Sequence, residues 1–184
     1  MFSIALADDA ELFPLEAWHA EEFLAHMDRG RKYIGQHIVL PDVVTDLDSA
    51  RSFLSTYAQK TAADGGRIHG IRVGGTLVGG VLFRTFDAQS GTCEVGCWLE
   101  PTAAGRGLVT KACRVLIDWA FHERGMHRAE WYASSANKKS LAVAERLGMT
   151  REGVLRQNHP HRGVRQDTEV WAVLAHEWPP ASTA

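Results

Sequence analysis

The chain has 184 residues, of which 45% are hydrophobic and 23% charged, and its formal net charge is −2. These values are ordinary for a globular protein, and they exclude the strong basic field that attracts nucleic acid or an anionic membrane. The N-terminus has no basic segment before a long apolar run, and no apolar stretch is long enough to span a bilayer. We therefore expect one cytoplasmic domain over residues 1–184, with a frayed tail over 178–184.

The first third of the chain is predicted to contain a short strand and two helices separated by an irregular segment. Residues 2–7 have the pattern of a short strand. Residues 9–27 have apolar side chains at helical spacing, and Pro14 limits the start of that helix. Residues 28–44 are predicted to be irregular. The basic side chains of this segment are Arg29, Arg31 and Lys32, and they either shape a ligand-binding site or form a solvated loop. Thr45 or Asp46 is predicted to cap a second helix that ends near residue 63.

The middle of the chain is predicted to be three antiparallel strands. Residues 68–73 and 77–83 flank Gly74-Gly75, a strong signal for a two-residue hairpin turn. Gly91 separates the second strand from a third over residues 92–99. The result is an antiparallel meander.

The last part alternates helix and strand. Residues 108–123 form a predicted helix that Gly125 ends, followed by a strand over 127–134 and a helix over 138–147 that Gly148 ends. Two further strands are predicted near 150–158 and 166–174. This order predicts an α/β (α+β) fold with a mixed, mostly antiparallel central sheet and about four flanking helices. Four tryptophans are expected in the core or in a pocket wall: Trp18, Trp98, Trp119 and Trp131.

A loop of small residues joins the strand over 92–99 to the helix that begins near Leu108. Its sequence is Ala104-Gly105-Arg106-Gly107. The first turn of a helix has backbone N–H groups without internal partners, and with the helix dipole they form a site for an anion. The glycines let a phosphate approach the backbone, and Arg106 adds positive charge. A loop that only connects strand to helix is the alternative, and a G-x-G sequence alone does not decide between the two.

A second motif begins where the strand over 127–134 ends. Asn137 is placed to cap the next helix, Ser140 follows in its first turn, and Leu147-Gly148-Met149 closes it. A purely structural cap is the alternative.

Together, the two segments resemble the GNAT superfamily of N-acetyltransferases, and more closely its RimJ/RimL-like branch. The resemblance covers residues 67–178 through the order and spacing of these motifs, and the first 66 residues fit in outline. Ala104 stands where the family usually has Gln or Arg, and Val109 stands where it has a small residue. Ala144 stands where many members have a tyrosine that acts as the acid for the departing thiolate. The resemblance therefore implies that Ser140 supports the thiolate instead.

The resemblance implies an enzyme that uses acetyl-CoA as co-substrate, without a metal, to acetylate an amine by direct attack on the thioester. The implied coenzyme-binding residues are Trp98, Leu99, Gly105, Arg106, Gly107, Leu108, Val109, Thr110, Asn137 and Ser140. The arm of the coenzyme is expected between the strands that end at Leu99 and near Ser134. The implied catalytic groups are Ser140 and a base, which is Glu94, His159 or a water molecule.

The resemblance also implies an amine acceptor, either a protein N-terminus or a small molecule, and it makes a homodimer the expected assembly. Two other functions are considered. A non-catalytic sensor of coenzyme A would share the phosphate loop, so the loop does not discriminate against it. A Rossmann-type nucleotide enzyme is disfavoured, because parallel sheets need crossover connections where this chain has a hairpin meander.

Overall fold

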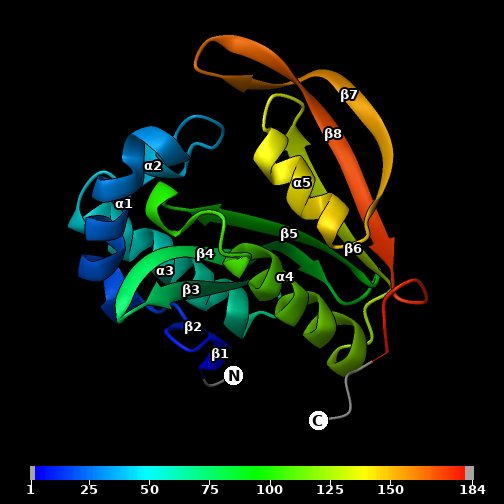
Figure 1. The fold of residues 1–184 in the computed structure, drawn as a ribbon, viewed down its shortest axis with the longest axis horizontal. Helices are drawn as coiled ribbons and strands as arrows, with labels where there is room; N and C mark the ends of the chain where they lie inside the picture. Colours follow the sequence, from blue (N-terminus) through cyan, green and yellow to red (C-terminus); the bar gives the residue numbers. More distant parts are fainter. Residues whose placement is uncertain (1–2, 181–184) are drawn as a thin grey trace.

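One sheet of eight strands forms the centre of the molecule (Figure 1). The computed structural model describes residues 3–180. The strand order is β1-β2-β3-β4-β5-β6-β8-β7, and in the described chain every neighbouring pair is antiparallel except β5 and β6. The strands are β1 (Ile4–Ala7), β2 (Ala10–Pro14), β3 (Arg67–Val73), β4 (Thr76–Asp87), β5 (Thr92–Leu99), β6 (Arg128–Ser134), β7 (Thr150–His161) and β8 (Val164–Leu174).

Helices cover both faces of this sheet (Figure 1). They are α1 (Ala20–Ile34), α2 (Leu40–Val43), α3 (Leu47–Ala62), α4 (Leu108–Asp118) and α5 (Lys138–Arg146), with single turns at Ala17–His19 and Pro101–Ala103 and a π-helical turn at Trp119–Glu123. Two apolar cores result. One includes Leu108, Leu116 and Leu141 beneath α4 and α5, and the other includes Phe23 and Leu54 beneath α1 and α3. The predicted α/β class with a mostly antiparallel sheet is confirmed. Among residues 3–180, no helix is both long and apolar enough to cross a membrane.

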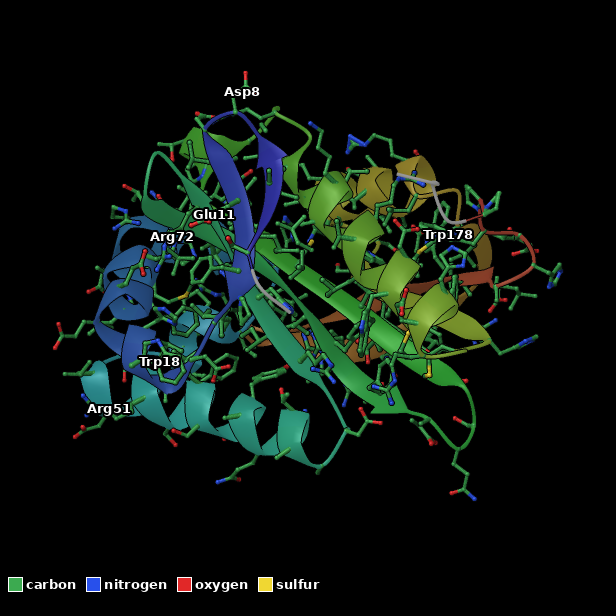
Figure 2. The ribbon with its side chains drawn as sticks, turned by 90° about the horizontal axis from the view of Figure 1, so that it is seen from below. Asp8, Glu11, Trp18, Arg51, Arg72 and Trp178 are labelled. Carbon is green, nitrogen blue, oxygen red and sulfur yellow. The ribbon has the colours of Figure 1, made fainter. Side chains whose placement is uncertain are left out.

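The predicted helix over 9–27 is wrong in its first half. Residues Ala10–Pro14 form β2, which pairs antiparallel with β3. Leu12 packs in the core beneath α4, whereas its neighbour Phe13 packs in the core beneath α1. A segment buried on both faces is an interior strand, and Leu12 and Leu15 fit a helical spacing only by coincidence. The side chains of paired residues lie together in Figure 2, where Glu11 of β2 is beside Arg72 of β3. Oε1 of Glu11 is 3.6 Å from Nη1 of Arg72.

The predicted irregular segment over 28–44 is wrong as well, because α1 continues to Ile34 and α2 follows at Leu40–Val43. The buried face of α1 includes Phe23, Met27, Gly30 and Ile34, which is a helical spacing. A glycine fills one core position of that face. A Cβ at Gly30 would lie 3.2 Å from the Cγ of Glu100, so the helix approaches the end of β5 closely there.

The hairpin turn, the predicted helix that ends near residue 63 and the two helices after the hairpin are confirmed. Gly74 and Gly75 have φ values of +54° and +79°, the left-handed conformation that such a turn requires. Asp46 caps α3 by accepting from the backbone N–H of Ser49 at 2.8 Å. Trp98 and Trp131 are buried as predicted, whereas Trp18 is 77% exposed and does not belong to the core (Figure 2).

The C-terminal hairpin is longer than predicted, because β7 extends to His161 and β8 begins at Val164. A bulge between Leu155 and His159 interrupts the register of β7. Trp178 is buried and donates from Nε1 to Asp118 Oδ1 at 2.6 Å, so the fraying predicted from residue 178 does not apply to it. Positions 181–184 of the predicted tail, and residue 2 of the predicted first strand, lie outside the described residues.

Candidate functional site

Strands β5 and β6 run parallel but separate after three residue pairs. The paired residues are Thr92 with Arg128, Cys93 with Ala129, and Glu94 with Glu130. Beyond them β5 continues along β4 and β6 continues along β8, and Figure 1 shows the two strands drawing apart. The facing edges therefore have backbone N–H and C=O groups that the sheet itself does not pair. Such groups need another partner, and an extended ligand arm between the strands could be that partner.

Leu99 has the backbone amide that points into this divergence. The next residue, Glu100, donates its N–H to the carbonyl of Val78 on β4 at 2.7 Å. Because successive amides of a strand point to alternate edges, the amide of Leu99 faces away from β4, and that of Trp98 faces toward it. Of the two coenzyme-binding residues implied on this strand, Trp98 and Leu99, only Leu99 therefore has its backbone amide directed toward β6.

The loop between β5 and α4 depends on two glycines. Gly105 has φ +82° and Gly107 has φ +72°, values that side-chain-bearing residues rarely adopt. Gly107 occupies the N-cap position of α4, and in the described chain no side chain caps this helix. The starts of α3 and α5, in contrast, are capped by Asp46 and Asn137. The first-turn amides of α4 therefore have no side-chain acceptor among the described residues, and uncapped amides at the positive end of a helix dipole can bind an anion.

The side chains around this loop face elsewhere. Arg106 pairs with Asp9 of the β1–β2 turn, with Nη2 2.5 Å from Oδ1, and the hydrogen bond from Arg106 lowers the pKa of Asp9. Leu108 and Val109 have buried side chains in the core beneath α4. Any contribution of these two residues to a bound anion therefore comes from their backbone amides.

Ser140 lies in the first turn of α5, next to β6. Its N–H donates to Asn137 Oδ1 at 3.2 Å, and its Oγ accepts from Trp131 Nε1 at 3.0 Å. An indole N–H can only donate, so Ser140 Oγ is the acceptor and its hydroxyl proton is available for another partner. The buried Trp131 thereby fixes the Ser140 hydroxyl beside the strand divergence.

Glu94 lies at the last paired position of β5, directly across from Glu130. Its neighbours Cys93 and Val95 pack beneath α4, so Glu94 points to the opposite face of the sheet. Arg84 Nε is 2.9 Å from Glu94 Oε1. Burial raises the pKa of Glu94 and Glu130 raises it further, whereas Arg84 opposes both. A carboxylate with a raised pKa is suited to accept a proton near neutral pH.

His159 lies at the far end of β7, after the bulge. Its ring centre is 6.1 Å from that of His161, which is buried and has Nε2 3.2 Å from the carbonyl oxygen of Gly35 in the turn after α1. Over residues 3–180, no hydrogen bond or ion pair joins His159 to Glu94 or Ser140. The structure thus places Glu94, Leu99 and Ser140 around the divergence, and His159 on the hairpin tip that contacts the end of α1.

Sequence reasoning missed one part of this region. Arg29 is not in a solvated loop: it lies in α1, and its Nη2 is 2.9 Å from Glu100 Oε1. His26 lies on the same helix with Nδ1 2.5 Å from the same oxygen. The sequence did contain a signal, because Glu100 stands between the apolar strand over residues 92–99 and Pro101. A glutamate that only faces solvent has no special reason to occur at that position.

Comparisons with known proteins agree with this geometry. The model of the acetyltransferase (GNAT) domain matches residues 7–150. YjcK of Bacillus subtilis (strain 168), named a probable N-acetyltransferase, is 31% identical over 88% of this chain and 91% of its own length. YdaF of the same organism, a proposed ribosomal N-acetyltransferase, is 28% identical over 97% of this chain and 98% of its own.

A solved structure extends the likeness to three dimensions. The self-immunity acetyltransferase MccE for microcin C7, in complex with acetyl-CoA and AMP, superposes with a TM-score of 0.84 at 26% identity. The match covers 91% of this chain and 93% of that one.

Proposed function

The chain belongs to the acetyltransferase (GNAT) family, and from that premise we propose which of its residues act and which amine it modifies. It is an acetyl-CoA-dependent N-acetyltransferase. The acceptor nitrogen attacks the thioester carbonyl, the carbon–sulfur bond breaks, and the nitrogen loses a proton. The family assignment gives no support to a non-catalytic coenzyme A sensor.

The coenzyme pyrophosphate is proposed to bind at the start of α4. The observation that carries this proposal is the uncapped first turn of α4, directly beside the divergence of β5 and β6. The amides from Gly107 to Thr110 would hold the phosphates, and Gly105 keeps the loop open in front of them. Arg106 would release its ion pair with Asp9 and pair with a phosphate instead, which would add positive charge to the site. Asn137 keeps the start of α5 in place on the other side of the arm.

The thioester is proposed to lie between Leu99 and Ser140. The Leu99 amide would donate to the carbonyl oxygen, which becomes an oxyanion during attack. The neighbouring Trp98 is buried and would hold this part of β5 in place. The Ser140 hydroxyl would donate to the sulfur as it leaves. Its own oxygen is already engaged by Trp131, so the hydroxyl is oriented before the thioester arrives.

Glu94 is the proposed base. It faces the side of the sheet opposite α4, close to the divergence, and its raised pKa suits proton transfer from an ammonium group, directly or through water. His159 remains the alternative, because the hairpin tip reaches the end of α1. The pH–rate profiles of Glu94→Ala and His159→Ala distinguish the two residues. An unchanged profile in both would leave water as the acceptor of the proton.

The acceptor is proposed to be a protein N-terminus, with a small amine as the alternative. The name of YdaF supports a ribosomal protein, and a ribosomal acceptor would place the enzyme in the cytoplasm. An acetyl-transfer screen across N-terminal peptides, polyamines and aminoglycosides, read by mass, tests this choice. Acetylation of the small amines alone would reject the protein acceptor.

A homodimer is part of the same proposal. Strand β7 is an edge of the sheet, and two apolar side chains on it are exposed, Val154 at 37% and Leu155 at 44%. An edge of this kind is commonly covered by another chain. Light scattering after gel filtration should give twice the chain mass, and Leu155→Glu should give the chain mass; a monomeric wild type would reject the assembly.

A further inference from the structure

A buried hydrogen-bond network joins α1 to the end of β5. His26 is completely buried, and both of its ring nitrogens have partners: Nδ1 lies 2.5 Å from Glu100 Oε1, and Nε2 accepts from Trp98 Nε1 at 2.8 Å. Because the indole can only donate, the imidazole proton is on Nδ1 and is donated to Glu100. Arg29 donates to Glu100 Oε1 at 2.9 Å and to the carbonyl of Leu77 at 2.7 Å.

The charges of this network are balanced without His26. Arg29 compensates the carboxylate of Glu100, and burial lowers the pKa of His26 more strongly than Glu100 raises it. The imidazole is therefore neutral near neutral pH and acts as a bridge between Trp98 and Glu100. A fully partnered polar network in a core is rigid and has one arrangement, which apolar packing at the same place would not ensure.

We propose that His26 is a positioning residue for the acetyl transfer, because it fixes Trp98 and Glu100, the two residues that flank Leu99. This inference rests on the proposed function, in which the Leu99 amide donates to the thioester oxygen. Trp98 and Glu100 hydrogen-bond to β4 through their backbones and to His26 through their side chains. The peptide group of Leu99 is thereby held between two anchored neighbours. The Arg29 side chain is 43% exposed, and an ion pair with an exposed partner contributes little stability, so a role in orientation accounts better for the cluster at this strand end.

The test compares His26→Leu with a matched control, His69→Leu. His69 is also a buried histidine, at 4% exposure, but it lies on β3 and its Nδ1 has no partner among the described residues. We expect His26→Leu to lower kcat at least tenfold, since small misplacements of an oxyanion donor are costly, and to change the KM for acetyl-CoA less than threefold. His69→Leu should leave both constants within a factor of two. His26→Gln, whose amide both donates and accepts, should recover part of kcat.

A spectroscopic measurement reports the bond itself. The carbonyl stretch of acetyl-CoA labelled with 13C at the acetyl group falls in frequency when the oxygen accepts a hydrogen bond. In His26→Leu it should rise toward its value in solution, and in His69→Leu it should stay at the wild-type value. If His26→Leu does not fold, Trp98→Phe removes the indole N–H that donates to His26 and keeps an aromatic ring of smaller volume, and it should show the same changes in kcat and carbonyl frequency at smaller amplitude.

Equal kcat in the two leucine variants, or an unshifted carbonyl stretch in His26→Leu, would overturn the inference. So would a loss confined to acetyl-CoA affinity, which would make the network a support for binding only. Failure of the proposed function is distinguishable, because the wild type itself would then show no shift of the carbonyl stretch on binding.

Discussion

Replacing Gly107 by alanine separates backbone geometry at the start of α4 from packing. Gly107 has φ +72°, and a Cβ there would meet no atom within 4 Å, so the substitution introduces strain without a clash. A left-handed alanine costs roughly 1–2 kcal/mol. The lower entropy of the unfolded chain offsets about 0.4–1 kcal/mol of this cost. The free energy of unfolding should fall by about 1 kcal/mol, which corresponds to a decrease in Tm of about 2–4 °C for a chain of this size.

Gly148→Ala is the matched control. Gly148 has φ +77° and equally open surroundings, but it lies at the end of α5 away from Ser140. Both variants should lose the same stability in thermal unfolding followed by circular dichroism. Only Gly107→Ala should bind coenzyme A more weakly in calorimetry, by about tenfold or about 1.4 kcal/mol, because relief of the strain rotates the donor amides. If the two variants bind coenzyme A equally well, the start of α4 is not the anion site.

Three further outcomes are expected. Ser140→Ala should lower kcat about tenfold or more and leave the Kd for coenzyme A within a factor of three; a weaker Kd with unchanged kcat would place Ser140 in binding only. Glu130→Gln should move the acid limb of the pH–rate profile to lower pH, because Glu130 raises the pKa of Glu94, and an unmoved limb would argue against Glu94 as base. Burial lowers the pKa of His69 to about 4 from 6.5. As the pH falls, the imidazole of His69 is therefore protonated in the unfolded chain before it is protonated in the folded protein. The free energy of unfolding that this difference contributes is fully present above pH 6.5 and is lost as the pH falls toward 4. His69→Leu should remove up to about 3 kcal/mol of that decline in urea unfolding at several pH values, and an identical decline in both proteins would contradict it.

The C-terminal two thirds of the fold could be predicted because its signals are local. Gly74-Gly75 specifies its own turn, and Asn137 caps a helix three residues away. The N-terminal third depends on distant partners. Residues Ala10–Pro14 become a strand by pairing with β3, about 60 positions later, and Gly30 is a core position of α1 that packs against the distant Glu100 as well as its own neighbour Ile34. Neither distant contact is encoded in the neighbouring residues.

The same distinction divides the candidate site. The glycine loop before α4 and the cap at Asn137 are contiguous motifs, so their positions follow from the sequence. The contact of Glu94 with Arg84 depends on the register of β4 and β5, and that of Ser140 with Trp131 depends on how α5 packs against β6; the motifs themselves specify neither. His26 escaped notice because its partners, Trp98 and Glu100, are more than 70 positions away and meet it only when α1 crosses the end of β5.

In the proposed binding mode, the separation of β5 from β6 leaves recognition of the acyl carrier to peptide groups, which every amino acid shares. A substitution that removed the proposed chemistry of Ser140 or Glu94 would then leave the carrier bound, so an inactive variant would sequester acetyl-CoA instead of ignoring it. Over longer times, a lineage built on this arrangement is free to exchange one acceptor for another by changing side chains, since the grip on its common donor does not have to be rebuilt.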